Sequence, residues 1–261
     1  DTNVKVGNTA LDSLTTGTNN VAVGENTLTA ATTGANNLGV GFESLKANTT
    51  GSNNVGLGYK ALTANTTANN NTAVGVNAFL SNTTATGGTA VGNQALENNT
   101  IGDNNTAVGL QALEANTTGS SNTSVGTQSL DANTTGADNT AVGKGALGAN
   151  TTASFNTAVG SDALRDVTTN TNNVAMGVNA ALTSTGSYNT AIGNNTFRGT
   201  SNSGSNCTAI GYNSLNANTT GGYNTAVGAN ALDANTTASE NTALGYAALG
   251  ANTTGASNVA V

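Results

Sequence analysis

A 17-residue unit repeats along the whole chain and constrains the fold more than any other feature of the sequence. Fifteen units are complete and a sixteenth ends at Val261; two adjacent units, 173–188 and 189–206, hold 16 and 18 residues. Such repeats indicate a solenoid, in which each unit buries its apolar face only against its neighbours. With the Asn of the motif Asn-Thr-Ala-Val-Gly as position 1, units begin at residues 3, 20, 37, 54, 71, 88, 105, 122, 139, 156, 173, 189, 207, 224, 241 and 258.

Residues at the same position in successive units form a column, and each column has its own composition. Position 5 is Gly in all fifteen complete units, position 4 is always apolar, and position 9 is Leu or Phe except where Ala181 and Leu182 compete for it. Charged residues avoid these columns and collect at position 10. The structural ladder residues that these columns predict are Gly24, Gly75, Gly109, Gly143, Gly228, Val74, Val108, Val142, Leu113, Leu130, Leu147, Asn105 and Asn139.

The columns predict an all-β fold, a parallel β-solenoid (β-roll) of about fifteen 17-residue coils in a single domain over 1–261. Two short strands are expected in each coil, at positions 1–5 and 8–11. Since side chains alternate along a strand, positions 2 and 4 are predicted to point inward with position 9, and position 10 to point outward. The Gly at position 5 is predicted where a positive φ or a close neighbour excludes a Cβ.

Asn dominates two columns, position 1 and position 12. Identical amides stacked about 4.8 Å apart form hydrogen bonds along the stacking axis, as in cross-β ladders. We therefore interpret these Asn residues as structural. Fifteen coils at that spacing predict a rod of roughly 70 Å. The residue lost from one irregular unit and the residue gained by the next are expected in turns, with pairing continuous through Met176, Ile192 and Ile210.

Position 3 is Ala or Gly in thirteen of the fifteen complete units. If this column faced water it would be expected to carry charge, as position 10 does. Its small, neutral residues favour close approach of another chain, and we predict a parallel homotrimer with this column at the contact. The alternative places the column inside a narrow monomeric coil, with Val and Leu in two layers. The predicted inter-chain face comprises Ala73, Ala107, Ala141 and Ala158.

The chemistry of the side chains argues against catalysis, cofactors and nucleic acid. The chain has no His, and a lone Cys207 supplies neither a disulfide nor a thiol enzyme with its base. Six Lys and Arg residues and a net charge of −7 do not suit a phosphate backbone. No apolar run is long enough to insert into a membrane. Glu97, Glu114 and Asp131 share one column and could hold a divalent cation weakly, but a solvated acidic edge is favoured.

Tandem Asn-Thr-Ala-Val-Gly-x-x-Ala-Leu units joined by Asn-Thr-Thr-Gly resemble the repeat regions of phage tail-fibre-like proteins. The heads of trimeric autotransporter adhesins, with shorter repeats, are a more distant likeness. The resemblance implies a parallel β-roll, trimerisation and a place in an extracellular shaft or head, on a cell or virion surface. This chain departs from the fibre family because it has neither a self-cleaving chaperone domain nor a distinct receptor-binding tip.

Three functions compete at this stage. The first is a non-catalytic structural fibre, shaft or adhesin segment whose partners are copies of itself and an unknown surface receptor. Its ends look like interior coils, so further sequence or end-to-end stacking into a filament is expected. The second is an ice- or carbohydrate-binding solenoid that uses its Asn ladders and the Thr ladders at positions 13 and 14. The third is a polysaccharide-cleaving enzyme, for which no carboxylate pair is evident. The Thr ladders include Thr49, Thr50, Thr66, Thr67, Thr117 and Thr118.

Overall fold

The computed structural model describes residues 2–200 and 202–261, and these form a parallel β-solenoid of about fifteen coils. Strands, turns and bends make up the described residues, which contain no helix. The chain divides into two compact units, one up to Thr135 and one from Gly136 to Val261. Both are built from the same coil, and each is described by itself.

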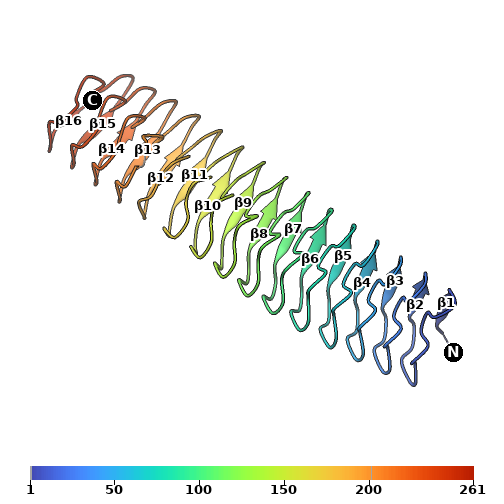
Figure 1. The fold of residues 1–261 in the computed structure, drawn as a ribbon. Coiled ribbons are helices and arrows are strands. Elements are labelled where there is room, and N and C mark those ends of the chain that lie inside the picture. Colours follow the sequence, from blue (N-terminus) through green and yellow to red (C-terminus); the bar gives the residue numbers. More distant parts are fainter. Residues whose placement is uncertain (1, 201) are drawn as a thin grey trace. The chain divides into compact units, whose positions relative to one another are not determined.

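The first unit contains eight three-residue strands, one in each coil. They are parallel, and in each coil the same three positions pair with their copies in the next coil (Figure 1). The strands are β1 (Val4–Val6), β2 (Val21–Val23), β3 (Leu38–Val40), β4 (Val55–Leu57), β5 (Thr72–Val74), β6 (Thr89–Val91), β7 (Thr106–Val108) and β8 (Thr123–Val125).

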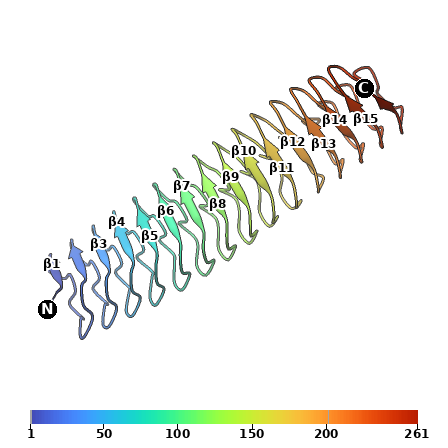
Figure 2. The same ribbon diagram turned by 180° about the vertical axis from the view of Figure 1, so that it is seen from behind.

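The second unit repeats this arrangement with eight further strands. Its pairing is again parallel and in register, and Figure 2 shows the strand arrows pointing the same way in successive coils. The strands are β9 (Thr140–Val142), β10 (Thr157–Val159), β11 (Val174–Met176), β12 (Thr190–Ile192), β13 (Thr208–Ile210), β14 (Thr225–Val227), β15 (Thr242–Leu244) and β16 (Val259–Ala260).

The prediction of a second strand at positions 8–11 is wrong, because no strand forms in this segment of any described coil and most of it is a turn. The backbone takes a positive φ at position 7, as in Asn26 at 57°, and again at the buried position 9, as in Leu113 at 53°. A non-Gly residue in this region is strained by about 1–2 kcal/mol. Hydrogen bonds to the next coil offset the strain: the Leu113 amide donates to the Ser129 carbonyl at 3.0 Å.

The predicted orientation of the strand is also wrong, because position 3 points inward and positions 2 and 4 point outward. The residues of the predicted inter-chain face are therefore inside the coil: Ala73, Ala107, Ala141 and Ala158 are all 0% exposed. The reason is the narrow interior. At Gly39 even an added Cβ would lie 2.6 Å from the Thr27 methyl group of the preceding coil, so a β-branched side chain does not fit there.

The core of each unit is therefore made of small residues, one large residue per coil and amides. Ala at positions 3 and 8 packs with Leu or Phe at position 9, and Leu113, Leu130 and Leu147 are fully buried. In the short coil Ala181 occupies position 9, with φ 49°, while Leu182 follows it and is 6% exposed. Burial of the position 9 column agrees with the sequence prediction.

The Gly of position 5 is required by both its backbone conformation and its neighbours. Its φ lies between 125° and 140° in all fifteen complete coils, where L side chains are rarely found. A Cβ added at Gly109 would also lie 2.5 Å from the Gly126 carbonyl oxygen of the next coil. Gly24, Gly75, Gly143 and Gly228 have the same conformation, so position 5 excludes a side chain for two independent reasons.

Buried Asn side chains join each coil to the next. The Asn139 amide donates to the Ala153 carbonyl at 2.8 Å, and its Oδ1 accepts the Asn156 backbone N–H at 3.0 Å. Asn105 makes the corresponding bonds, to Gly119 at 2.7 Å and from Asn122 at 2.9 Å. Position 12 forms a second ladder with direct amide-to-amide bonds, such as Asn65 to Asn48 at 2.8 Å. Buried polar groups are thus satisfied along the stacking direction.

Where Asn is missing from position 1, the residue at position 9 of the preceding coil is Phe. A Cβ built at Gly88 would overlap the ring of Phe79, so the ring occupies the space that an Asn side chain would need. Phe197 is likewise followed by Cys207 at position 1. Phe79 and Phe197 are at most 1% exposed. The two columns therefore share one interior volume.

The irregular units keep their strands in register, as the sequence predicts. Met176 pairs with Ile192, and Ile192 pairs with Ile210. The short unit lacks the residue before Gly186, which lies at position 15 because its carbonyl accepts the Asn173 amide at 3.1 Å. The long unit has its additional residues between Gly199 and Asn202, where Asn202 takes the place of a position 12 amide. Both changes fall outside strands β11, β12 and β13, and Ser201 of the long unit lies outside the described residues.

Val167 and Ser184 interrupt the position 12 ladder in two successive coils, where most coils have Asn. The Ser184 hydroxyl and the Asn202 Nδ2 are both buried without a hydrogen-bond partner. Replacing Ser184→Asn should supply the missing acceptor and raise the free energy of unfolding by about 1 kcal/mol, measured by chemical denaturation. The gain should disappear in an Asn202→Ala background. An unchanged midpoint in the parent background would contradict this interpretation.

Candidate functional site

The outward face of the strands is the most continuous uncharged surface of each unit. Positions 2 and 4 carry Thr, Val, Leu, Ile or Met in every described strand, with no charged residue among them. Val142 is 36% exposed and Leu244 is 48% exposed, although other members of these columns are half-buried by their neighbours. We call this surface the Thr/Val face. Eight strands about 4.8 Å apart and three residues long give it roughly 400 Å² in each unit.

The Thr columns predicted to bind ice or carbohydrate have two different environments. At position 13 the hydroxyls of Thr49 and Thr66 donate to carbonyls of the next coil at 3.0 and 3.1 Å, and that of Thr117 does so at 3.0 Å. Position 13 therefore belongs to the hydrogen bonding of the solenoid. Position 14 is exposed in every coil that has it, but there Ile101 replaces Thr and the irregular coils lack the residue. The exposed Thr residues include Thr50, Thr67 and Thr118.

In the acidic column of Glu97, Glu114 and Asp131, the surroundings disfavour the charged form of Glu114 and of Asp131. Burial and the carboxylates of Glu97 and Asp131 raise the pKa of Glu114, and burial raises the pKa of Asp131. Among the described residues no group of three or more His, Cys, Asp or Glu side chains could hold a metal ion. Nothing in the described geometry therefore favours a cation site.

The raised pKa of Glu114 predicts how stability depends on pH. The folded state binds this proton more tightly than the unfolded state, so the associated stabilisation is present at low pH and is lost as pH rises through the folded pKa. Glu114→Gln should therefore raise the melting temperature at pH 7, and the gain should shrink as the pH approaches the ordinary Glu value of 4.5. Glu240→Gln, at a different column, is the matched control. Equal gains at both pH values would contradict the prediction.

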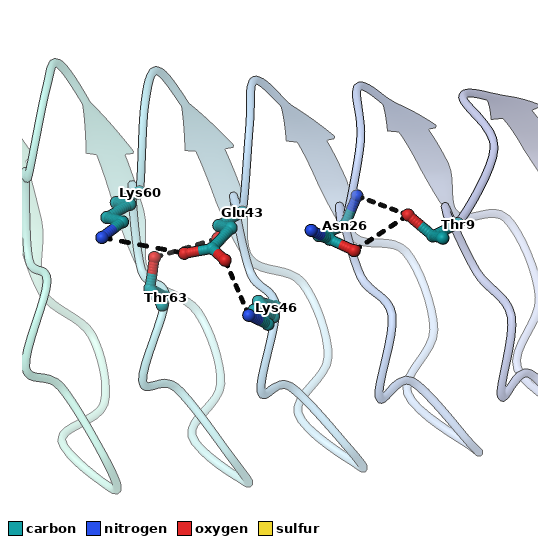
Figure 3. Close-up of polar contacts among 6 residues, drawn as sticks. All are labelled: Thr9, Asn26, Glu43, Lys46, Lys60 and Thr63. Atoms are coloured by element: carbon teal, nitrogen blue, oxygen red, sulfur yellow. Dashed lines mark hydrogen bonds and ion pairs between the residues drawn. The ribbon is translucent and has the colours of Figure 1, made fainter.

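One surface cluster in the first unit combines rings and charges, and Figure 3 shows its charged residues Glu43, Lys46 and Lys60. Glu43 Oε1 accepts a hydrogen bond from the Lys46 ammonium at 2.7 Å, and Glu43 Oε2 lies 3.8 Å from the Lys60 Nζ. The Lys46 hydrogen bond is the main reason that the pKa of Glu43 is lowered. The Tyr59 ring stacks on Phe42 with centroids 5.7 Å apart and lies below the Lys60 ammonium. Pairs this exposed contribute little to stability.

The lone thiol of the chain, Cys207, is not activated as a nucleophile. Cys207 is buried, and burial raises the pKa of its thiol to about 11, which leaves it protonated at neutral pH. Some described carboxylates accept hydrogen bonds from neighbouring hydroxyls, Asp103 from Thr86 at 3.2 Å and Glu240 from Ser257 at 3.1 Å. No described helix could cross a membrane.

Comparison with known proteins does not assign a family. Neither the protein-family models nor the curated proteins contain a match to the chain. The functional argument therefore depends on the surfaces of the molecule itself.

Proposed function

We propose that the chain is a non-catalytic structural segment of an extracellular fibre or adhesin that associates with copies of itself. The observation that carries this proposal is the Thr/Val face. An uncharged strip of roughly 400 Å² per unit is comparable in size to the largest apolar patch of a typical monomer, and such patches are often functional. Because each strand presents uncharged residues at the same two positions, a second copy can bury the whole strip without any change of register.

In this proposal the contact between chains is the Thr/Val face and not the position 3 Ala column, which is buried inside the coil. A parallel homotrimer places three such faces around a common axis and removes them from water, which adds apolar burial that the thin core of a single coil lacks. The resemblance of the repeats to phage fibre and adhesin heads supports the same assembly and an extracellular location. The predicted stacking of ends into a filament is a further level of association, which electron micrographs would reveal.

Self-association should be lost when a charge is placed on the Thr/Val face. The wild-type chain is expected to sediment at three times its mass of 25.3 kDa. Val142→Glu, at a side chain already 36% exposed, should yield folded monomers because three buried carboxylates would repel each other. Thr152→Glu, on the exposed position 14 column, should leave the trimer intact. A wild-type chain that stays monomeric and folded on concentration would refute the proposal.

A further inference from the structure

In the second unit, large aromatic side chains occur in a column where other coils have Asn, Gly, Ser or an acidic residue. Phe155, Tyr188 and Tyr223 all lie at position 17, the residue before the strand motif. They are 59%, 62% and 66% exposed, which makes them among the most exposed large apolar side chains of this unit. Isolated exposed aromatics need no explanation, but an ordered row of them does.

The three rings leave the backbone in the same way. Position 17 has a positive φ in each of these coils, 62° at Phe155, 61° at Tyr188 and 57° at Tyr223. Each amide donates to the position 16 carbonyl of the preceding coil, for example Tyr223 to Ser205 at 3.0 Å. The side chains therefore start from equivalent points on one line. Bulky residues are uncommon in this backbone region, so their strain suggests a role that outweighs local preference.

The spacing of the row is regular. The aromatic residues occupy alternate coils, and Asn172 and Asn206 lie at position 17 of the coils between them with φ values of 61° and 59°. Two coil intervals of about 4.8 Å place successive rings roughly 9.5 Å apart. The row alternates a flat apolar ring with an amide that can both donate and accept hydrogen bonds.

We propose that this column, 155–223, is a binding site for an extended, neutral β-1,4-linked polysaccharide. Sugars in such a chain are flipped relative to their neighbours, so the same ring face recurs once per disaccharide, a length close to two coil intervals. Each aromatic ring can stack on the apolar face of every second sugar, while the Asn amides between them reach the hydroxyls of the intervening sugars. The row is uncharged from Phe155 to Tyr223 and is bounded by Asp138 and Glu240, which favours a neutral glycan over an acidic one.

This inference extends the adhesive function and does not depend on self-association. The Thr/Val face lies at positions 2 and 4, whereas the aromatic row lies at position 17. Sedimentation tests the first surface and glycan retention tests the second, so failure of one leaves the other result intact.

The experiment measures retention of the full chain on microcrystalline cellulose and on chitin, with α-linked dextran beads as the comparison surface. Retention is expected on at least one β-1,4-linked glycan and not on dextran. Tyr188→Ala, which removes the central ring, should weaken binding at least tenfold, whereas Tyr188→Phe should keep it within about threefold because stacking remains. Tyr246→Ala, at position 6 and 81% exposed, is the matched control and should bind as the wild type does.

Several outcomes would overturn the proposal. One is a wild-type chain that neither glycan retains, and another is equal retention of wild type and Tyr188→Ala. A third is a Tyr188→Ala chain with a lower sedimenting mass, which would assign the aromatic row to contacts between copies. Because Tyr188 is mostly exposed, circular dichroism of Tyr188→Ala is expected to match the wild type.

Discussion

Ala141→Glu is expected to prevent folding of the second unit, whereas Thr140→Glu, one residue earlier, is expected to leave it folded. Ala141 is 0% exposed and pairs with Ala158 inside the coil, so a carboxylate there would be buried without a partner. Such burial costs several kcal/mol, which is a large fraction of the stability of most domains. Thr140 points outward from the same strand.

Circular dichroism and thermal melting of the two variants would check this prediction. Ala141→Glu should lose the cooperative transition and the strand signal, while Thr140→Glu should keep both, as expected of a folded chain with a charge on the Thr/Val face. The reverse result, with a tolerated Ala141→Glu and an unfolded Thr140→Glu, would show that position 3 points outward and position 2 inward.

Gly88→Asn is expected to destabilise the first unit by about 3 kcal/mol, even though Asn is the usual residue at that position. The added side chain would collide with the Phe79 ring, which already fills the shared volume. Phe79→Leu alone should be destabilising because it leaves a cavity. The double variant restores the combination found in most coils, Leu at position 9 followed by Asn at position 1, and should recover most of the loss.

A double-mutant cycle measured by chemical denaturation tests this coupling. The two single changes should be strongly non-additive, since each relieves the defect that the other creates. Simple addition of the two losses would show that the Phe79 ring and position 1 do not compete for space.

The coil architecture could be predicted from the sequence because its determinants repeat. A fixed 17-residue period, an invariant Gly and two Asn columns together require stacked parallel strands. The positive φ of the Gly and the hydrogen bonds between Asn side chains have the predicted form. The continuous register through the irregular units could also be predicted, since a slip within a strand would reverse every side chain.

The orientation of the strand could not be predicted from alternation alone. Alternation places Ala on one side of the strand and Thr and Val on the other, but it does not say which side is buried. The larger apolar side chains of Val74 and Val108 suggested that they are in the core, whereas they lie half-buried on the outside. The deciding quantity is the width of the interior. The sequence contains indirect evidence of this narrow width in pairs such as Thr27 with Gly39 and Phe79 with Gly88. In each pair a larger residue in one column is matched by Gly in another.

The turn at positions 7–9 was missed for a local reason. Asn at position 7 is a recognised signal for positive φ, but Leu at position 9 is not, and its apolar character suggested a strand. The aromatic row was visible in the sequence as Phe155, Tyr188 and Tyr223 in one column at alternate coils. The Thr columns are the more regular pattern, although the position 13 hydroxyls donate to backbone carbonyls.

The identical register of successive coils also affects how such a gene can change length. Because Thr89 pairs with Thr72 in the same way that Thr106 pairs with Thr89, removal of residues 89–105 would bring equivalent strands into contact. Unequal recombination between repeats would add or remove whole coils, and each remaining coil would still pair with an equivalent coil on either side. The length of the solenoid can therefore vary in steps of 17 residues while its local structure stays constant.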